Sequence, residues 1–498
     1  MNWQAIEWGA MLPELIVLGT SLLLILLDLF LRKTVSRRPL GFLALLGVAG
    51  AFSALVLQLH EPSIQLFHDM YRVDGFSKTF KMLLLIGTFL VLCLAYDAKL
   101  GREENVRGEF YYLILTALVG AMFMASSADM ITLFIGLELL SVSSYIMAGL
   151  KKHDAQSTEA AFKYVVSGGI ATAITLFGMS YLFGLSGETN LYSMAKALQE
   201  TALPDQSYML VFAFFITFTG LAFKIASVPF HMWAPDVYEG AMVPVTAFLS
   251  VVSKTAGFIF IIRFFVLVFM MSKGVNSDSL LQQVQPYIIW LSGITMLVGS
   301  IIALRQSNVK RLFAYSSIAQ AGFILAAFSV FTPALFETMW FYLFAYVLMN
   351  IGAFAVIQEV TTRNNDTGMT SFEGLGKQSP WLALAMTIFL LSLAGIPATV
   401  GFIGKFGILI ALLGYGGLHY VLAGILIAAT LLSYVYYFNL IVQMYFRTGE
   451  VKEKRRSQKG LLIVTIVCAA ATVIFGIVPN IALHFFYEQF SISTFLQL

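Results

Sequence analysis

Fourteen apolar stretches, each about 20 residues long, follow one another along this chain and limit it to one kind of fold. A helix of about 20 apolar residues crosses the hydrocarbon core of a bilayer. The composition supports a membrane location, because 59% of the residues are hydrophobic and only 11% are charged, against about 25% charged in soluble domains. The sequence therefore predicts an all-α membrane protein with fourteen transmembrane helices. The stretches begin near Met11, Leu40, Phe76, Phe110, Asp129, Ala160, Met209, Val243, Pro286, Val309, Pro333, Trp381, His419 and Gly460.

The positions of Lys and Arg predict the orientation of these helices. Cytoplasmic loops of membrane proteins retain an excess of both residues. Of the 30 in this chain, twenty lie in or beside loops that follow odd-numbered stretches, and five lie on the other side. We therefore expect residues 32–38 and 452–459 in the cytoplasm and both chain ends outside the cell. Glu7 and Glu14 stand where a signal peptide would have basic residues, so no cleaved leader is expected.

Prolines interrupt the seventh and twelfth stretches. Pro229 in the seventh is followed by Pro235 and Pro244, and Pro397 stands in the twelfth beside several glycines. Proline removes a backbone donor and frees carbonyls that lipid cannot satisfy, so such breaks indicate a hydrated interior lined by protein. A single kink is also common in ordinary membrane helices, and this alternative stays open for either break alone.

The two breaks lie five stretches apart, which predicts an internal repeat. Five-helix units in tandem must have opposite orientations, and interrupted segments at matching positions of two halves indicate a transport site near the bilayer centre. We therefore predict two inverted five-helix repeats, formed by stretches four to eight and nine to thirteen. The expected division is an N-terminal three-helix segment at 1–109, repeats at 110–268 and 269–447, and a C-terminal helix at 448–498.

Four charged side chains lie near the middle of apolar stretches: Glu138, Lys224, Lys254 and Lys405. Each costs several kcal/mol in the bilayer centre unless it is paired or hydrated, and ionisable residues at this depth are functional by default. Lys224 and Lys405 also lie beside the two breaks. A carboxylate that approaches a lysine stabilises the charged lysine, and its departure favours release of the proton. These four residues therefore predict proton transfer.

Three further residues have less specific explanations. Lys163 and Arg263 stand near the ends of their stretches, where long side chains can reach the interface. His231 follows the seventh-helix break and is a candidate proton relay, because its ring titrates near neutral pH. A hydrogen-bonding role at the interface is the alternative for His231.

Motifs for other chemistries are missing from the sequence. Cys93 and Cys468 stand singly within apolar stretches, so they form neither a disulfide framework nor an iron–sulfur ligand set. The chain has no phosphate-binding loop, no zinc-protease motif and no dinucleotide-binding fingerprint. The driving energy is therefore expected from an ion gradient or from partner subunits.

The seventh stretch carries the segment through which the chain resembles a known family. Residues 223–241 read FKIASVPFHMWAPDVYEGA and are similar to the seventh-helix signature of the antiporter-like subunits of respiratory complex I and of cation/proton antiporters. Within this family the resemblance is strongest to the subunit N branch. The features that carry it are Leu12-Pro13-Glu14-Leu15, Asp236-Val237-Tyr238-Glu239-Gly240, and Gly401-Phe402-Ile403-Gly404-Lys405-Phe406.

The resemblance implies roles for the buried charges. Glu138 and Lys224 would form an interacting pair, Lys254 would be the central relay, and Lys405 the exit-side residue. The family also has two inverted five-helix repeats. Ala398 follows Pro397 where the family often has a second proline, so the twelfth-helix break is expected to be less rigid.

The resemblance further implies that the chain translocates protons, coupled to electron transfer from NADH to quinone in other subunits. It implies a hetero-oligomer with other antiporter-like and small core subunits of complex I, in a bacterial inner or plasma membrane. FMN, iron–sulfur clusters and quinone are expected in those partners, and no cofactor in this chain. A Mrp-type or stand-alone cation/proton antiporter subunit is the main alternative. A membrane scaffold with inactive buried charges is the third.

Overall fold

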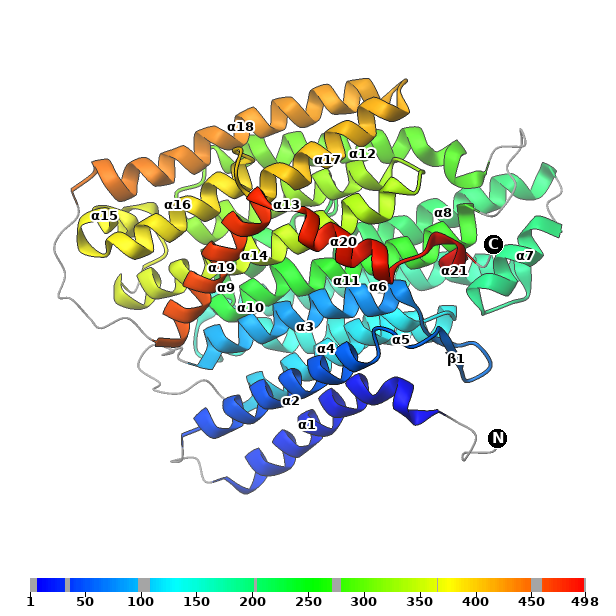
Figure 1. Cartoon of the computed structure of the whole chain (residues 1–498), viewed down its shortest axis with the longest axis horizontal. Coiled ribbons are helices and arrows are strands. Elements are labelled where there is room, and N and C mark those ends of the chain that lie inside the picture. The colour runs from blue at the N-terminus through cyan, green and yellow to red at the C-terminus, as the bar shows by residue number, and fades with distance from the viewer. Residues whose placement is uncertain are drawn as a thin grey trace.

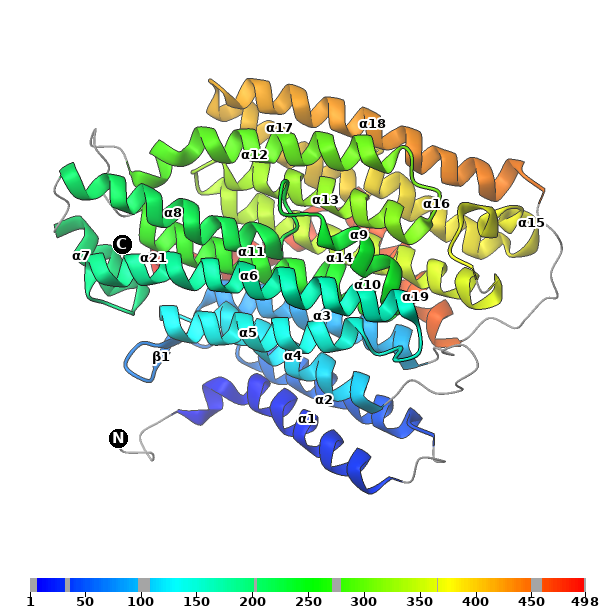
Figure 2. The same cartoon turned by 180° about the vertical axis from the view of Figure 1, so that it is seen from behind.

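The computed structural model describes residues 7–31, 36–96, 108–200, 204–270, 279–364, 366–448 and 459–496. Most of these residues are helical, and the long helices lie side by side along the length of the molecule (Figures 1 and 2). Twelve helices in the described part are long and apolar enough to cross a membrane. The prediction of a helical membrane protein is confirmed at this level. The predicted cytoplasmic segments 32–38 and 452–459 lie mostly outside the described residues.

The helices follow the apolar stretches, because a segment in lipid must satisfy its backbone groups internally. The first half contains η2 (Trp8–Met11), α1 (Leu12–Phe30), α2 (Arg38–Leu57), α3 (Gly75–Tyr96), α4 (Gly108–Ser126), α5 (Met130–Ala148), α6 (Ala155–Ser186), α7 (Leu191–Glu200), α8 (Pro204–Lys224), α9 (Trp233–Gly240), α10 (Val243–Phe248), η3 (Leu249–Ser253), α11 (Lys254–Ile261) and η4 (Ile262–Met270). The second half contains α12 (Leu280–Ala303), α13 (Val309–Phe328), α14 (Ala334–Asn364), η5 (Met369–Phe372), α15 (Leu375–Gln378), α16 (Pro380–Ala394), α17 (Val400–Tyr415), α18 (His419–Phe446), α19 (Lys459–Ile477), α20 (Asn480–Gln489) and α21 (Ile492–Leu496).

Helical structure is interrupted at both places where the sequence predicts a break. α8 ends at Lys224 and is separated from α9 by the segment 225–232. α16 ends at Ala394, and α17 begins at Val400. Gly395 stops α16 with a positive φ of 84°, a conformation that glycine adopts without a steric penalty. The break in the seventh stretch follows a helix of 21 residues, whereas the twelfth stretch is divided into α16 with 15 residues and α17 with 16.

The helix from Val243 to Met270 is completely buried over its most apolar part. It is not a uniform α-helix. The π-helical segments η3 and η4 flank α11 on its two sides. π-turns inside longer helices occur frequently at functional sites. Lys254 is the first residue of α11 and directly follows η3.

The layers of helices run from α1 and α2 at one edge of the molecule to α18 at the opposite edge (Figure 1). The C-terminal helix α19 crosses one face. It contacts α3 from the first half and α14, α16 and α17 from the second. α19 therefore joins the two halves of the chain.

One end of the molecule gathers segments that are far apart in sequence. Strands β1 (Ile64–Leu66) and β2 (Tyr71–Val73) pair antiparallel there, with Ile64 opposite Val73. The all-α prediction missed this hairpin, because strands of three residues are too short to show an alternating pattern. α7 and α21 lie at the same end, whereas α15 lies at the other (Figure 1).

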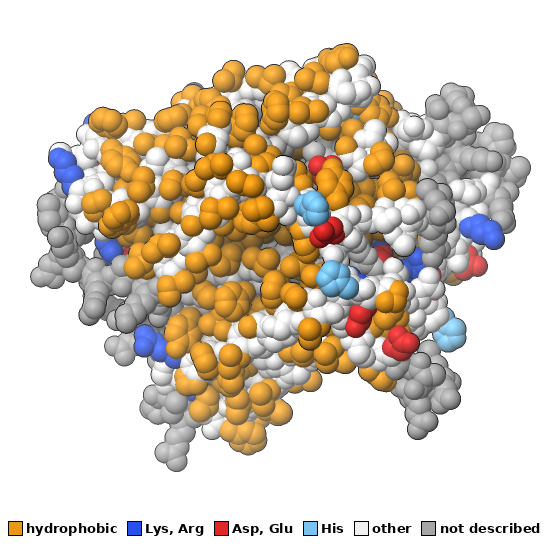
Figure 3. All heavy atoms as spheres, viewed as in Figure 1, with side chains coloured by type: hydrophobic (Ala, Val, Ile, Leu, Met, Phe, Trp, Pro, Cys, Tyr) orange, Lys and Arg blue, Asp and Glu red, His pale blue; other side chains and the backbone are white. Residues whose placement is uncertain are grey.

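The surface is mostly apolar. Hydrophobic side chains cover most of the face in Figure 3, and Lys and Arg appear mainly at the end where α15 lies. Exposed apolar area of this extent is typical of a protein surrounded by lipid or by other membrane subunits.

Candidate functional site

The predicted partners Glu138 and Lys224 lie on α5 and at the end of α8. Lys224 Nζ donates a hydrogen bond to Ser141 Oγ at 3.0 Å, and Ser141 lies one turn after Glu138 on α5. Glu138 is half-buried and accepts a hydrogen bond from Thr172 Oγ1 of α6 at 2.8 Å. Among the described residues, no carboxylate oxygen lies within ion-pair distance of Lys224 Nζ. The direct partner of Lys224 is therefore a serine, and Glu138 is its neighbour along the helix.

Lys254 is held by one residue of a neighbouring helix. Its side chain is 1% exposed, and its Nζ donates to the backbone oxygen of Ser317 at 2.6 Å and to Ser317 Oγ at 2.9 Å. Ser317 belongs to α13, and its hydroxyl also lies 3.4 Å from the Tyr238 hydroxyl of α9. Gly257, one turn after Lys254, leaves room for the side chain of Lys224, because a Cβ there would lie 3.3 Å from Lys224 Cγ. The two lysines thus approach the same stretch of α11.

Lys405 is held by the end of the broken helix. Its Nζ donates to the backbone oxygens of Leu393 at 2.8 Å and Ala394 at 3.2 Å, which are the last carbonyls of α16. The C-terminal end of a helix carries partial negative charge, so it stabilises a cation. The ring of Phe323 lies 4.5 Å from Nζ and adds a cation–π contact. The break predicted from Pro397 therefore creates the acceptor group for this lysine.

Helix α13 connects the surroundings of Lys254 and Lys405. Gln320 lies one turn after Ser317 and donates from Nε2 to the Leu393 oxygen at 3.4 Å, the same oxygen that accepts from Lys405. The Tyr342 hydroxyl of α14 donates to Gln320 Oε1. Polar groups therefore run from one lysine to the other through a buried helix. Ser317 and Gln320 were not predicted as site residues, although two polar residues one turn apart in an apolar stretch are a signal for such a site.

His231 does not take part in the hydrogen bonds made by the three lysines. It lies in the segment 225–232 and is buried, and its Nδ1 has no hydrogen-bond partner among the described residues. A buried ring nitrogen without a partner is costly unless water or another molecule reaches it. The relay role of His231 stays a prediction.

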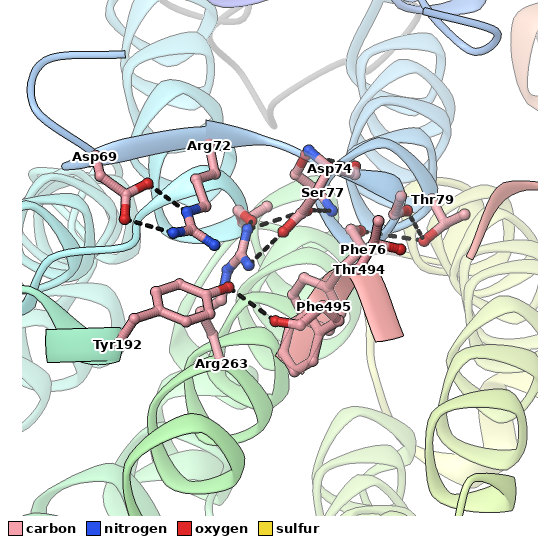
Figure 4. Close-up of polar contacts among 12 residues, drawn as sticks. Asp69, Arg72, Asp74, Phe76, Ser77, Thr79, Tyr192, Arg263, Thr494 and Phe495 are labelled. Carbon is pink, nitrogen blue, oxygen red and sulfur yellow. Dashed lines mark hydrogen bonds and ion pairs between the residues drawn. The ribbon is translucent and has the colours of Figure 1, made fainter. Parts of the chain in front are cut away.

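Arg263 corrects an expectation about depth. Its side chain is fully buried and does not reach an interface: it donates to Asp74 Oδ2 at 2.6 Å and Oδ1 at 3.2 Å, and to the Ala125 oxygen at 2.8 Å (Figure 4). Lys163 agrees better with the expectation, because it is 42% exposed and pairs with Glu159 and Asp236. The error arose because the segments that cover Arg263 are far away in the sequence.

A second buried pair lies at the same end of the molecule as Arg263. Lys81 Nζ lies 2.6 Å from Glu14 Oε1 and 3.1 Å from the Tyr71 hydroxyl, and both charged side chains are almost completely buried. Arg72 binds Asp69 nearby and stacks on the ring of Tyr192 at 3.6 Å (Figure 4). In contrast to the lysines of the interior, these cations have carboxylate partners.

The comparison with known families assigns the chain. The family model described as "NADH:quinone oxidoreductase/Mrp antiporter, TM" matches residues 127–433. The chain belongs to this antiporter family. The matched part of the chain contains all five predicted site residues: Glu138, Lys224, His231, Lys254 and Lys405.

Curated relatives within the antiporter family place the chain in its subunit N branch. NADH-quinone oxidoreductase subunit N of Anoxybacillus flavithermus is 51% identical over 99% of this chain and 98% of its own length. The protein with the same name from Bacillus anthracis is 50% identical over 98% of this chain and 96% of its own length. The resemblance drawn from the sequence is therefore confirmed.

Solved structures of the family agree with the fold. A chain of respiratory complex I from Thermus thermophilus is 27% identical, with a TM-score of 0.78, over 95% of this chain and 98% of that one. A chain of the Mrp complex from Dietzia shares only 18% identity, with a TM-score of 0.83 over 97% of both chains, and shows the fold alone. The same fold therefore occurs in a chain of respiratory complex I and in a chain of the Mrp complex.

Proposed function

We propose that this chain is the antiporter-like membrane subunit of an NADH-quinone oxidoreductase. It translocates protons across a bacterial membrane while other subunits transfer electrons from NADH to quinone. The observation that carries this proposal is the buried series Lys224, Lys254 and Lys405, joined in part through Ser317 and Gln320. The names of the similar curated relatives support the assignment to this enzyme complex.

The contacts of the three lysines suit repeated loss and gain of a proton. Each ammonium group donates to a hydroxyl or a backbone carbonyl, and these acceptors carry no full charge. Deprotonation of such a lysine leaves no unpaired buried carboxylate behind, so loss of the proton does not create a new buried charge. Serine and tyrosine hydroxyls can both donate and accept hydrogen bonds. Ser317 and Tyr238 thus give Lys254 neighbours that can pass a proton on.

Glu138 is placed to bias this series. Its carboxylate lies one turn from Ser141, the acceptor of Lys224, so movement of α5 relative to α8 would change the field at Lys224. Glu138 is also only half-buried, although a charge at this depth needs polar surroundings. A partner membrane subunit of the complex that covers this part of α5 and α6 would supply them.

We also propose that the interrupted helices complete fourteen spans. In this arrangement α8 with α9 forms the seventh span and α16 with α17 the twelfth, beside the twelve long helices. The inverted repeats would be residues 110–268 and 269–447, flanked by segments 1–109 and 448–498.

Two matching β-bridges support the inverted repeats. Asp129 caps the start of α5 and bridges to Asn190 after α6, whereas Asn308 caps the start of α13 and bridges to Gly368 after α14. In both cases the bridge joins the residue that caps the second helix of a proposed repeat to the connecting segment that follows the third helix of the same repeat. The bridge at Asn190 lies beside α7, and the bridge at Gly368 precedes α15, at opposite ends of the molecule (Figure 1). Opposite orientation of the two units explains this placement.

The proposed orientation puts both chain ends outside the cell. It rests on the uneven distribution of Lys and Arg. It also agrees with the packing of η2 and α21 at the hairpin end, where Gln58 Nε2 donates to the Gly9 oxygen and the Tyr192 hydroxyl donates to the Phe495 oxygen. Cysteines introduced at Arg455 and near the C-terminus test it in intact cells. An impermeant thiol reagent should label only the second site, and labelling at Arg455 would contradict the proposal.

The redox chemistry is assigned to partner subunits. FMN, iron–sulfur clusters and quinone would be bound there, and this chain would contribute proton transfer alone. In the described part of the chain, no group of three or more His, Cys, Asp or Glu residues is arranged to hold a metal ion. The Mrp-type alternative has weaker support, because the Mrp chain shares 18% identity whereas the subunit N relatives share about half of their residues.

The substitution Lys405→Met tests the function with a matched control. In membrane vesicles that oxidise NADH, it should reduce proton uptake per assembled complex by about tenfold or more, because it removes the acceptor at the end of the series. Lys377→Met changes an exposed lysine of α15 and should leave proton uptake unchanged. Normal proton uptake by Lys405→Met, with normal complex content, would exclude this lysine from the transfer path.

A further inference from the structure

Arg263 occupies an anchor at the hairpin end of the molecule that no part of the proposed proton path uses. Arg263 is the second residue of η4, inside the helix from Val243 to Met270, and its guanidinium joins this helix to two helix ends: it binds Asp74 at the start of α3 and donates to Ala125 near the end of α4. Asp74 also accepts a hydrogen bond from the Ser77 amide at 2.7 Å, as an N-terminal helix cap does. An anion at a helix start and a cation at a helix end are both favoured by the helix dipole. The anchor therefore has a fixed geometry.

The C-terminal segment closes this anchor. The rings of Phe76 and Phe495 lie 5.0 and 5.4 Å from the Arg263 guanidinium carbon, and the Phe495 backbone oxygen accepts a hydrogen bond from the Tyr192 hydroxyl at 2.9 Å (Figure 4). Burial raises the pKa of Tyr192 above its ordinary value, so this hydroxyl keeps its proton. At Gly75 a Cβ would lie only 2.0 Å from the Gln489 oxygen, so the segment packs directly on the start of α3.

The same C-terminal segment reaches the second half of the chain. The Tyr487 hydroxyl of α20 donates to Glu337 on α14, and the ring of Phe490 packs 4.8 Å from Phe336. Phe336 also contacts Phe495 at 5.1 Å. The segment 480–496 therefore connects α14 with the covering of Arg263.

The helix that contains Arg263 also contains Lys254. α11 lies between the π-helical segments η3 and η4, and Arg263 is the second residue of η4. A π-turn holds one residue more than an α-turn, and exchange between the two forms rotates and shifts the residues between them. In the described part of the chain, both hydrogen bonds of the Lys254 ammonium group go to Ser317, so a small shift of α11 changes both of them. The position of Lys254 therefore depends on how the C-terminal end of α11, which adjoins Arg263, is held.

We infer that Arg263 is a positioning residue for Lys254, and that the C-terminal segment 480–496 is the closing part of its anchor. Asp74, Ala125 and the Phe495 ring hold Arg263 at the start of η4, directly after α11, and this holds α11 in the register that places Lys254 against Ser317. This inference rests on the proposed role of Lys254 in proton transfer. It adds one residue, Arg263, and one segment, 480–496, which lie outside the path and determine the position of Lys254 within it.

Mild variants of the anchor test the inference in the assembled complex. Arg263→Lys keeps the charge but cannot reproduce the two-sided contact of a guanidinium with Asp74 and Ala125. Phe495→Ala opens the covering, and Tyr192→Phe removes one hydroxyl. His484→Ala is the control, because His484 lies on the same C-terminal segment and is 76% exposed. Complex content, proton uptake per assembled complex and its pH profile are measured for each.

We expect Arg263→Lys to reduce proton uptake per assembled complex by about threefold to tenfold and to shift the pH profile, because the surroundings of Lys254 change. Phe495→Ala should have a smaller effect in the same direction, and His484→Ala none. A variant that lowers only the amount of complex, with an unchanged pH profile, would overturn the inference. Tyr192→Phe keeps the test decisive if the other two variants do not assemble, because it removes a single atom group.

Lys254→Met, measured alongside, separates the two proposals. If Lys254→Met pumps normally, the proposed path through Lys254 is wrong. If Lys254→Met does not pump, but all three anchor variants keep the ordinary pH profile, the path stands and the anchor inference alone fails.

Discussion

Two groups of buried cations differ in what neutralises them. Lys224, Lys254 and Lys405 in the interior bind hydroxyls and backbone carbonyls, whereas Arg263 and Lys81 at the hairpin end each bind a carboxylate. Loss of a proton from Lys81 would leave Glu14 charged and unpaired in an apolar site, which costs several kcal/mol. Loss of a proton from Lys254 leaves only neutral groups. The comparison teaches that burial alone does not make a charge mobile; the partner decides.

The largest expected effect is on the paired group. Arg263→Met should destabilise the chain by about 3–5 kcal/mol, because it leaves the Asp74 carboxylate buried without a cation. We expect the complex to be almost absent from membranes, as measured by native gel electrophoresis. The double variant Asp74→Asn with Arg263→Met removes both charges and should recover part of the content. Equal loss in the single and double variants would contradict the ion-pair explanation.

The complementary change is in the lysines that bind uncharged acceptors. Lys254→Met removes a cation without leaving an opposite charge, so the complex should assemble. Proton uptake per assembled complex should fall by about 100-fold, the scale on which a positioned proton-transfer group contributes. Lys196→Met on the exposed face of α7 is the control. A large loss of complex content in Lys254→Met would weaken the contrast between the two groups.

Glu138→Gln tests the carboxylate that lies one helical turn from Ser141, the acceptor of Lys224. We expect proton uptake and quinone reduction to fall together by about tenfold, because the change removes the charge that biases Lys224. Complex content should stay normal, since Glu138 has no cation within ion-pair distance among the described residues. Glu159→Gln is the matched control, because Glu159 is 60% exposed and pairs with Lys163, which is 42% exposed. Normal pumping in Glu138→Gln would make Glu138 a structural carboxylate.

A smaller effect is expected from Ser317→Ala. The backbone oxygen of residue 317 still accepts from Lys254, so only one of two hydrogen bonds is lost. Removal of one such bond changes the balance between the protonation states by about 1 kcal/mol, and proton uptake should fall by about threefold to tenfold. The pH profile of pumping should move at the same time. Ser193→Ala on the exposed side of α7 provides the control.

The smallest effect is expected at Lys163. Its pairs with Glu159 and Asp236 are partly exposed, and such pairs contribute about 0–1 kcal/mol. Lys163→Gln should therefore leave complex content and proton uptake within about twofold of the unmodified protein. A loss comparable to that of Lys254→Met would show that exposure is a poor guide to which cations matter.

The sequence located the residues of the candidate site but not their contacts. Glu138, Lys224, Lys254 and Lys405 were identified because each interrupts a long apolar stretch, and Pro397 marked the break that exposes the carbonyls around Lys405. The partner of Lys254 was not predictable from its surroundings in sequence, because Ser317 is 63 residues away. Glu138 and Lys224 were expected to form a pair, whereas Ser141 makes the contact with Lys224.

What the sequence by itself determined is that this protein lies in a membrane and which of its charges stand inside apolar stretches. Hydropathy, proline positions and the distribution of Lys and Arg are local properties, and each segment's insertion into a bilayer depends on its own residues and flanks. The tertiary structure alone decided which buried cations are paired. Arg263 lies 189 residues from Asp74, and Phe495 covers both from the last turn of the described chain. Such partners depend on how helices pack, and packing selects neighbours by shape and polarity over the whole fold, which no single segment encodes.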